Sequence, residues 1–187
     1  MKTTWRHIGI QAAGWGRTLA WLAAAALLAR TAFWLYGWLS PCGAVATIYR
    51  GEAFQKARWI CCLRRLEYGC EGRPAPFVSR DRYSMRIKAR LYVPKTAVYD
   101  FATLSDDGIR IRIDGQPLID NWREQDFYRS GRSASRELSA GFHELGVEFC
   151  NFRGAARFRV EWCGGPIPPR TVLGPPYLCK PPWKDRW

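Results

Sequence analysis

The chain has 187 residues, of which 48% are hydrophobic and 14% aromatic, and it carries a formal net charge of +13. That apolar content excludes general disorder, and the length fits one domain with its own core plus a short appendage. The basic excess favours anionic partners such as lipid headgroups, acidic glycans or an acidic protein. Nucleic acid is not an expected partner, because no zinc-finger, helix-turn-helix or RNA-recognition signature is present.

An apolar segment follows the basic residues 1–17. Residues 18–39 contain one charge, Arg30, and would form a helix about 33 Å long, enough to cross the hydrocarbon core of a bilayer. Trp34 and Trp38 lie toward its end, as in the aromatic belt of a membrane interface. We therefore expect a single-pass transmembrane helix that serves as a signal anchor, with Arg30, Trp34 and Trp38 available to contact a partner.

The charges before this segment predict its orientation. Lys2, Arg6 and Arg17 place the N-terminus in the cytoplasm, and the rest of the chain in the periplasm or outside the cell. A cleaved signal peptide is the alternative, because residues 19–29 alone match an apolar signal region and small residues follow at 43–44.

The cysteines all follow the apolar segment, which fits an oxidising compartment with disulfide bonds or buried thiols. Their number is odd, so at least one has no intramolecular partner. Zinc is the alternative, although the cysteines nearest in sequence lack the paired spacing that structural zinc prefers. The seven are Cys42, Cys61, Cys62, Cys70, Cys150, Cys163 and Cys179.

The pattern of apolar residues predicts an all-β domain. Ile109, Ile111 and Ile113 alternate with arginines, as in a half-buried strand. Asp114-Gly115 predicts a type I′ hairpin turn, because both central positions of that turn need positive φ. Strands are expected over Tyr83–Val93, Val98–Leu104, Ile109–Ile113, Pro117–Asp120, Gly141–Cys150 and Ala155–Trp162.

The tail from residue 164 is rich in Pro and Gly, so it cannot be an interior strand throughout. We expect it to wrap the domain or to reach toward a partner. Trp183 in this tail is interpreted as an interface anchor.

Several motifs in a fixed order resemble one known family. SDDGIRIRIDG at residues 105–115, followed by LIDNW, resembles the core of the protective-antigen (PA14) domain family. Residues 43–51, 83–101 and 138–162 are similar to its opening strand, its "vP…YxF" segment and its closing hairpin. The resemblance spans about residues 43–177 and leaves 178–187 as a Pro- and Trp-rich tail. It implies an all-β antiparallel barrel or sandwich, here with one N-terminal transmembrane helix.

The resemblance also implies a metal site at Asp106 and Asp107. In the glycan-binding members of the family, such as yeast flocculation adhesins, paired aspartates at this place hold Ca²⁺, and the ion contacts sugar hydroxyls. Asn151 would be the third ligand, and Trp122 is placed both in the core and in the ligand-binding set. In the alternative, Asp106 caps the turn, Asp107 accepts backbone N–H groups and Gly108 supplies positive φ.

No catalytic motif is present, so we expect a protein that is not an enzyme, and His143 is interpreted as structural. One hypothesis is a membrane-anchored, extracytoplasmic binding module that recognises glycans with calcium. The other is an accessory subunit of a membrane complex, which would dock through its helix and one basic face of the β domain. That face would combine Arg86, Lys88, Arg90, Arg110, Arg112, Arg157 and Arg159.

Overall fold

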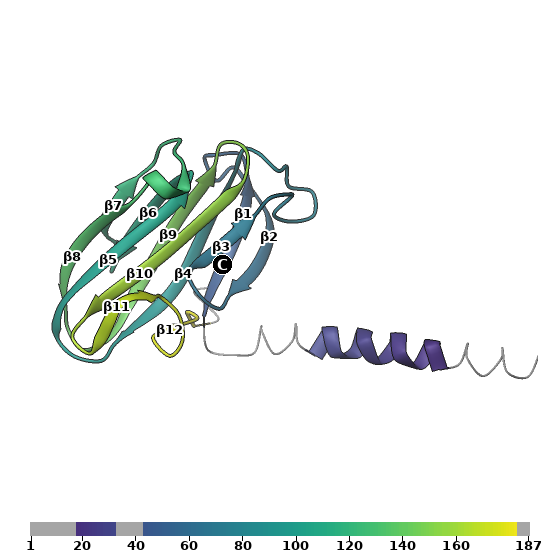
Figure 1. Ribbon diagram of the computed structural model, residues 1–187, viewed down its shortest axis with the longest axis horizontal. Coiled ribbons are helices and arrows are strands. Elements are labelled where there is room, and N and C mark those ends of the chain that lie inside the picture. The colour runs from purple at the N-terminus through teal and green to yellow at the C-terminus, as the bar shows by residue number, and fades with distance from the viewer. Residues whose placement is uncertain (1–17, 33–42, 183–187) are drawn as a thin grey trace, which may run out of the picture. The chain divides into compact units, whose positions relative to one another are not determined.

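The computed structural model describes residues 18–32 and 43–182 (Figure 1). The chain divides into two compact units, Met1–Ser40 and Pro41–Trp187. In the first unit, residues 18–32 form a helix in which Arg30 is exposed. Within the described residues, no helix is both long enough and apolar enough to cross a membrane. The transmembrane helix predicted over 18–39 is therefore not supported, and Trp34, Trp38 and Trp183 lie outside the described residues.

The second unit consists of two antiparallel sheets. The first has the order β2 (Lys56–Leu63), β1 (Ala44–Arg50), β4 (Tyr83–Val93), β9 (Gly141–Asn151), β6 (Gly108–Ile113) and β7 (Gln116–Asn121), and β12 (Leu178–Cys179) also pairs with β4. The second has the order β11 (Ile167–Val172), β10 (Ala156–Gly164), β5 (Ala97–Asp106) and β8 (Arg132–Leu138), and β3 (Glu67–Cys70) also pairs with β10. A 3₁₀ turn, η1 (Phe127–Arg129), connects β7 to β8 (Figure 1).

The core lies between the two sheets, because every second residue of each central strand faces inward. In β4 the buried side chains include Tyr83, Met85 and Ile87. Phe149 of β9 packs on Phe158 of β10, with ring centroids 5.1 Å apart, and so joins the sheets. Other aromatic side chains pack beside them: Trp162 stacks on Tyr99 and Phe101 and meets Tyr177 edge-on, and Tyr68 stacks on Phe158.

Several predictions from the sequence are confirmed. The strand predicted over Tyr83–Val93 has the same bounds in the structure. Asp114 and Gly115 have φ values of 51° and 75°, as the hairpin turn between β6 and β7 requires. Part of the Pro-rich tail forms β11, which lies at the edge of its sheet, where proline is tolerated.

Other predictions are narrowed or corrected by the structure. The described strands form two separate sheets, so of the barrel and the sandwich that the resemblance implied, the domain is the sandwich. Trp122 is half-buried on the outer face instead of lying in the core. Asn121, the last residue of β7, is buried, so the next residue in the alternation faces outward. Of the disulfide bonds or buried thiols expected, the disulfide bonds are not supported: Cys61, Cys62, Cys70, Cys150 and Cys163 are free thiols, and Cys150 is buried.

The prediction of a single basic face is also wrong, because the basic residues assigned to it come from different sheets. Arg86, Lys88 and Arg90 lie on β4 and the arginines of β6 lie two strands away, whereas those of β10 belong to the second sheet. Carboxylates interrupt the first group, because Glu148 of β9 stands between Arg86 and Arg110 in the strand register. Arg86 donates to Glu148 at 3.1 Å.

Candidate ligand site at the paired aspartates

Asp106 and Asp107 connect the two sheets, since β5 ends at the first and β6 begins just after the second. A cis peptide bond joins them. Asp107 is 2% exposed, and each of its carboxylate oxygens accepts a backbone N–H: Oδ1 from Gln125 at 3.1 Å and Oδ2 from Phe152 at 2.7 Å. The alternative interpretation of Asp107 as an acceptor of backbone N–H groups is therefore confirmed.

Gly108 is required here by a close approach between strands. A Cβ atom at this position would lie 2.7 Å from Sγ of Cys150 and 3.3 Å from Cα of Trp122. The positive φ that the alternative assigned to Gly108 is wrong, because this residue begins β6 with an ordinary strand backbone. The absence of a side chain lets β9 and the segment after β7 both approach the aspartates.

The loop between β7 and β8 is fastened to this turn by Gln125. Its Nε2 donates to the backbone oxygen of Asp107 and to Oγ of Ser105, both at 2.9 Å. Its Oε1 accepts from Nδ2 of Asn121 at 2.9 Å, and Ser130 Oγ accepts the backbone N–H of Ser105 at 2.7 Å. Gln125 and Ser130 were not predictable from the sequence, because residues of an irregular loop have no periodicity that assigns them a partner.

Asp106 is half-buried and lies beside other acidic groups. Burial raises the pKa of its carboxyl to about 6, and the charges of Asp107 and Asp126 add to this effect, while Arg157 opposes it. Arg157 is the residue opposite Asp106 in the strand register. Negative charge is therefore concentrated at this end of the sandwich, where a cation would relieve it.

Asn151 ends β9, next to the residue whose N–H binds Asp107. Its side chain is fully buried, and its Nδ2 donates to the backbone oxygens of Arg80 at 3.0 Å and Gly154 at 3.4 Å. Its Oδ1 is buried and has no hydrogen-bond partner within the part of the chain that the structure describes. A buried amide oxygen left without a partner is unfavourable, and a ligand or cation beside it would satisfy it.

The side-chain oxygen ligands of Asp106, Asp107 and Asn151 suit a hard cation. They comprise two carboxylates and one amide oxygen, while Ca²⁺ takes six to eight oxygen ligands, so backbone carbonyls or waters would have to complete the set. Within residues 18–32 and 43–182, no three His, Cys, Asp or Glu side chains cluster closely enough to hold a metal ion. Burial raises the pKa of the nearby Cys150 thiol to about 12, which makes this side chain a poor ligand for zinc.

The side chains of Trp122 and His143, the other residues singled out in the sequence, make their contacts elsewhere. The Trp122 ring packs on Phe54, with centroids 5.7 Å apart, and the guanidinium of Arg110 lies 4.5 Å from the Trp122 ring centroid. His143 lies at the hairpin turns, where Nδ1 is 2.7 Å from Asp114 and Nε2 is 2.9 Å from the backbone oxygen of Ser139. Neither is among the groups that bind Asp107.

Relatives of known structure share this fold. An anti-sigma factor domain-containing protein from Clostridium clariflavum superposes with a TM-score of 0.69 at 18% identity, covering 75% of this chain and 48% of that one. A PA14 sugar-binding domain from an RTX adhesin gives 0.63 at 16% identity, covering 76% and 100% respectively. At these identities the likeness shows the fold alone.

Among curated proteins, the anti-sigma-I factor RsgI3 of Acetivibrio thermocellus is 31% identical over 139 residues. The match covers 65% of this chain and 21% of that protein, so the chain spans about a fifth of its relative's length. Residues 63–165 match the family model described as the PA14 domain. The chain therefore belongs to the PA14 domain family.

Proposed function

We propose that this protein is a non-catalytic, carbohydrate-binding module whose ligand site is the loop end around Asp106, Asp107 and Asn151. The observation that carries the proposal is the buried Asn151 Oδ1, which has no partner among the described residues and precedes Phe152, whose N–H binds Asp107. Calcium is proposed as the bound ion, held by these three side chains. When bound, it would offer open coordination positions to sugar hydroxyls.

The surroundings of the aspartates support a sugar ligand. Tyr128 in η1 is 79% exposed, and its backbone N–H donates to Asp126, one of the charges that raise the pKa of Asp106. An exposed aromatic ring beside polar oxygens offers a stacking surface for the apolar face of a sugar. The adhesin domain of similar fold is described as sugar-binding, which is consistent with the proposal.

A glycan array tests the proposal with the full chain, read in the presence of calcium and again with a chelator. Asp106→Asn is the informative variant, because Asp107 carries backbone hydrogen bonds and its loss would disturb the fold. We expect at least a tenfold loss of binding in Asp106→Asn and in the chelator. Asp120→Asn is the matched control: this exposed carboxylate of β7 forms a surface ion pair with Arg110. Binding that survives both the chelator and Asp106→Asn contradicts the proposal.

We also propose that residues 18–39 anchor this module in a membrane, with the β domain on the extracytoplasmic side. The support is the apolar composition of this segment, with Arg30 as its single charge, and the helix over residues 18–32. Alkaline extraction of membranes from cells that make the full chain is the test. The protein should stay in the pellet, and release into the supernatant contradicts the anchor. Replacing Leu22 and Leu27 with Lys should release it.

A protein partner is the second candidate function, since an anti-sigma factor is among the relatives. The exposed Arg30 would contact such a partner in an accessory subunit of a membrane complex. Extraction in mild detergent should then yield an assembly much heavier than the 21.5 kDa chain. This candidate would be excluded if the natural chain is extracted as a monomer and Arg30→Ala does not change the extracted mass.

A further inference from the structure

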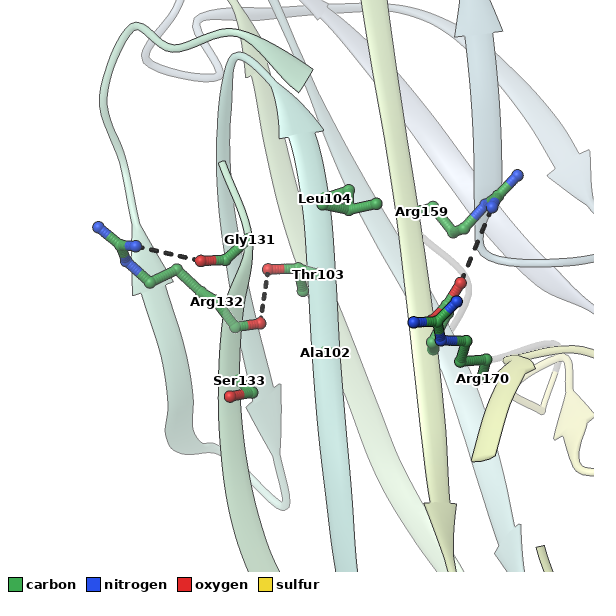
Figure 2. A pocket seen from close by; sticks show the side chains of 9 residues that line it. Ala102, Thr103, Leu104, Gly131, Arg132, Ser133, Arg159 and Arg170 are labelled. Atoms are coloured by element: carbon green, nitrogen blue, oxygen red, sulfur yellow. Dashed lines mark hydrogen bonds and ion pairs between the residues drawn. The ribbon is translucent and has the colours of Figure 1, made fainter. Parts of the chain in front are cut away.

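A trough lies on the outer face of the second sheet, away from the paired aspartates. It has a volume of about 500 Å³, within the range of about 300–1,000 Å³ found for small-molecule sites. It crosses β5, with β8 on one side and β10 and β11 on the other (Figure 2). Its lining residues are Ala102, Thr103, Leu104, Gly131, Arg132, Ser133, Arg159, Glu161 and Arg170.

Small residues make the floor of the trough. The strand register places Ala102 between Ser133 of β8 and Glu161 of β10, so two of the three central side chains are short. Thr103 Oγ1 donates to the backbone oxygen of Arg132 at 3.5 Å, which fixes the beginning of β8 beside β5. The concave shape therefore follows from the sequence of these strands.

Arginine side chains form the walls, three against one glutamate. Figure 2 shows Arg132 on one side of β5 and Arg159 and Arg170 on the other. Arg159 is already paired, since its Nε donates to Glu67 at 2.8 Å and its Nη1 lies 3.8 Å from Glu161.

The other two arginines differ from Arg159. Arg132 donates to the backbone oxygen of Gly131 at 3.1 Å, and both Arg132 and Arg170 are exposed. Within the described ranges 18–32 and 43–182, no carboxylate pairs with either guanidinium. Arg170 also holds φ at 57°, a left-handed conformation that is uncommon for a residue other than glycine.

We propose that this trough is a second subsite, which binds an acidic sugar residue through its carboxylate or sulfate group. Arg132 and Arg170 would bind the anion, because planar guanidinium groups pair with such oxyanions in a bidentate way. The sugar ring would lie over Ala102 and Ser133. The choice of a glycan rests on the proposed function, but the subsite uses none of its calcium ligands.

The position of the trough favours one extended ligand over an acidic peptide. Ala102, Leu104 and Asp106 alternate along β5 and so face the same side of the sheet. Four residues of a strand span about 13 Å, so a chain of a few sugar rings reaches from the trough to Asp106. A glycan that carries a uronate at one position and neutral sugars at the next would contact both sites.

Calorimetric titration of the full chain tests this subsite. The ligands are tetrasaccharides that contain glucuronate or galacturonate, a sulfated tetrasaccharide, and the carboxyl-reduced form of each uronate probe. The double variant Arg132→Ala, Arg170→Ala should bind the acidic probe at least ten times more weakly than the natural chain. The double variant Lys56→Ala, Arg58→Ala removes the same charge from exposed positions of β2 and should change affinity less than twofold.

The outcomes separate this inference from the proposed calcium site. Acidic tetrasaccharides should still bind Asp106→Asn, and in the presence of a chelator, through the trough alone. Equal affinity of the trough variant and the natural chain for every acidic probe overturns the subsite. It is likewise overturned if carboxyl-reduced probes bind as well as the acidic ones, or if a polyglutamate peptide binds the trough and no acidic sugar does. If the natural chain binds no glycan, neutral or acidic, the proposed function itself is rejected.

Discussion

Nδ1 of His143 lies 2.7 Å from Oδ2 of Asp114, and Nε2 of the same ring lies 2.9 Å from the backbone oxygen of Ser139. A carboxylate and a carbonyl both accept, so both ring nitrogens must donate, which only the protonated imidazolium does. His143 thus links the β6–β7 turn to the turn before β9.

This arrangement makes stability depend on pH. Burial lowers the pKa of His143, but the hydrogen bonds to Asp114 and to the Ser139 carbonyl outweigh it, so the pKa is raised above its ordinary 6.5. The folded state therefore binds the proton more tightly, and the added stability is complete below pH 6.5 and is lost as pH rises through the folded-state pKa. We expect the urea midpoint to fall as pH increases from 6 to 8.

Asp114→Asn isolates this effect. Asparagine tolerates the positive φ of residue 114 and keeps an acceptor for the Glu144 N–H, which Oδ1 of Asp114 binds at 2.8 Å. The variant should fold and should show a much smaller fall in the urea midpoint over the same pH range. An unchanged pH dependence in Asp114→Asn would mean that His143 is not the responsible group.

Gly108→Ala should destabilise the domain by about 1–3 kcal/mol, because the new methyl group overpacks against Cys150 and the backbone near Trp122. Denaturant unfolding measures the change. Gly146→Ala is the matched control in the same sheet, since nothing lies within 4 Å of its added Cβ. In the double variant with Cys150→Ala, the cost of the alanine at 108 should shrink. Equal costs in both backgrounds would contradict the proposed clash.

Gln125→Ala should lower stability by about 1–3 kcal/mol, since the backbone oxygen of Asp107 and the amide of Asn121 both lose a partner. It should also weaken glycan binding, because the loop that carries Tyr128 is no longer fastened to the aspartates. Unfolding curves and the glycan array give the two readouts. Gln116→Ala changes an exposed glutamine at the start of β7 and should be neutral in both. If Gln125→Ala keeps full stability, the loop has another attachment.

Tyr128→Ala should leave stability unchanged, because this side chain is largely exposed, and should reduce binding of neutral glycans. The expected loss is about tenfold, which corresponds to about 1.4 kcal/mol. Phe77→Ala is the control, since Phe77 is even more exposed and lies in another loop. Equal effects of the two substitutions would exclude a specific role for Tyr128.

The regular part of the fold was predictable because its signals are local. The alternation of Ile109, Ile111 and Ile113 and the Asp114-Gly115 turn determine β6 and its hairpin without any distant residue. β8 was missed because RSASREL carries small and charged residues and only its last residue is buried. Its strand conformation depends on pairing with β5, which no local pattern records.

The candidate site was predictable only in part. The paired aspartates and Asn151 were found through the family resemblance, and the burial of Asp107 agrees with its interpretation as an acceptor of N–H groups. The trough was not predictable, because Ala102, Arg132 and Arg170 come from three strands whose order along the sheet differs from their order in the sequence. Long-range pairing places them together, and a single sequence contains no local signal for it.

Calcium binding by the natural chain tests the central claim most directly. In a calorimetric titration of the full chain, we predict saturable binding of one Ca²⁺ per chain, abolished in Asp106→Asn and retained in Asp120→Asn. Calcium should also raise the thermal midpoint of the natural chain, because a ligand that binds only the folded state stabilises it. Absence of binding, or equal binding by the natural chain and Asp106→Asn, would contradict the assignment of the paired aspartates as the ligand site.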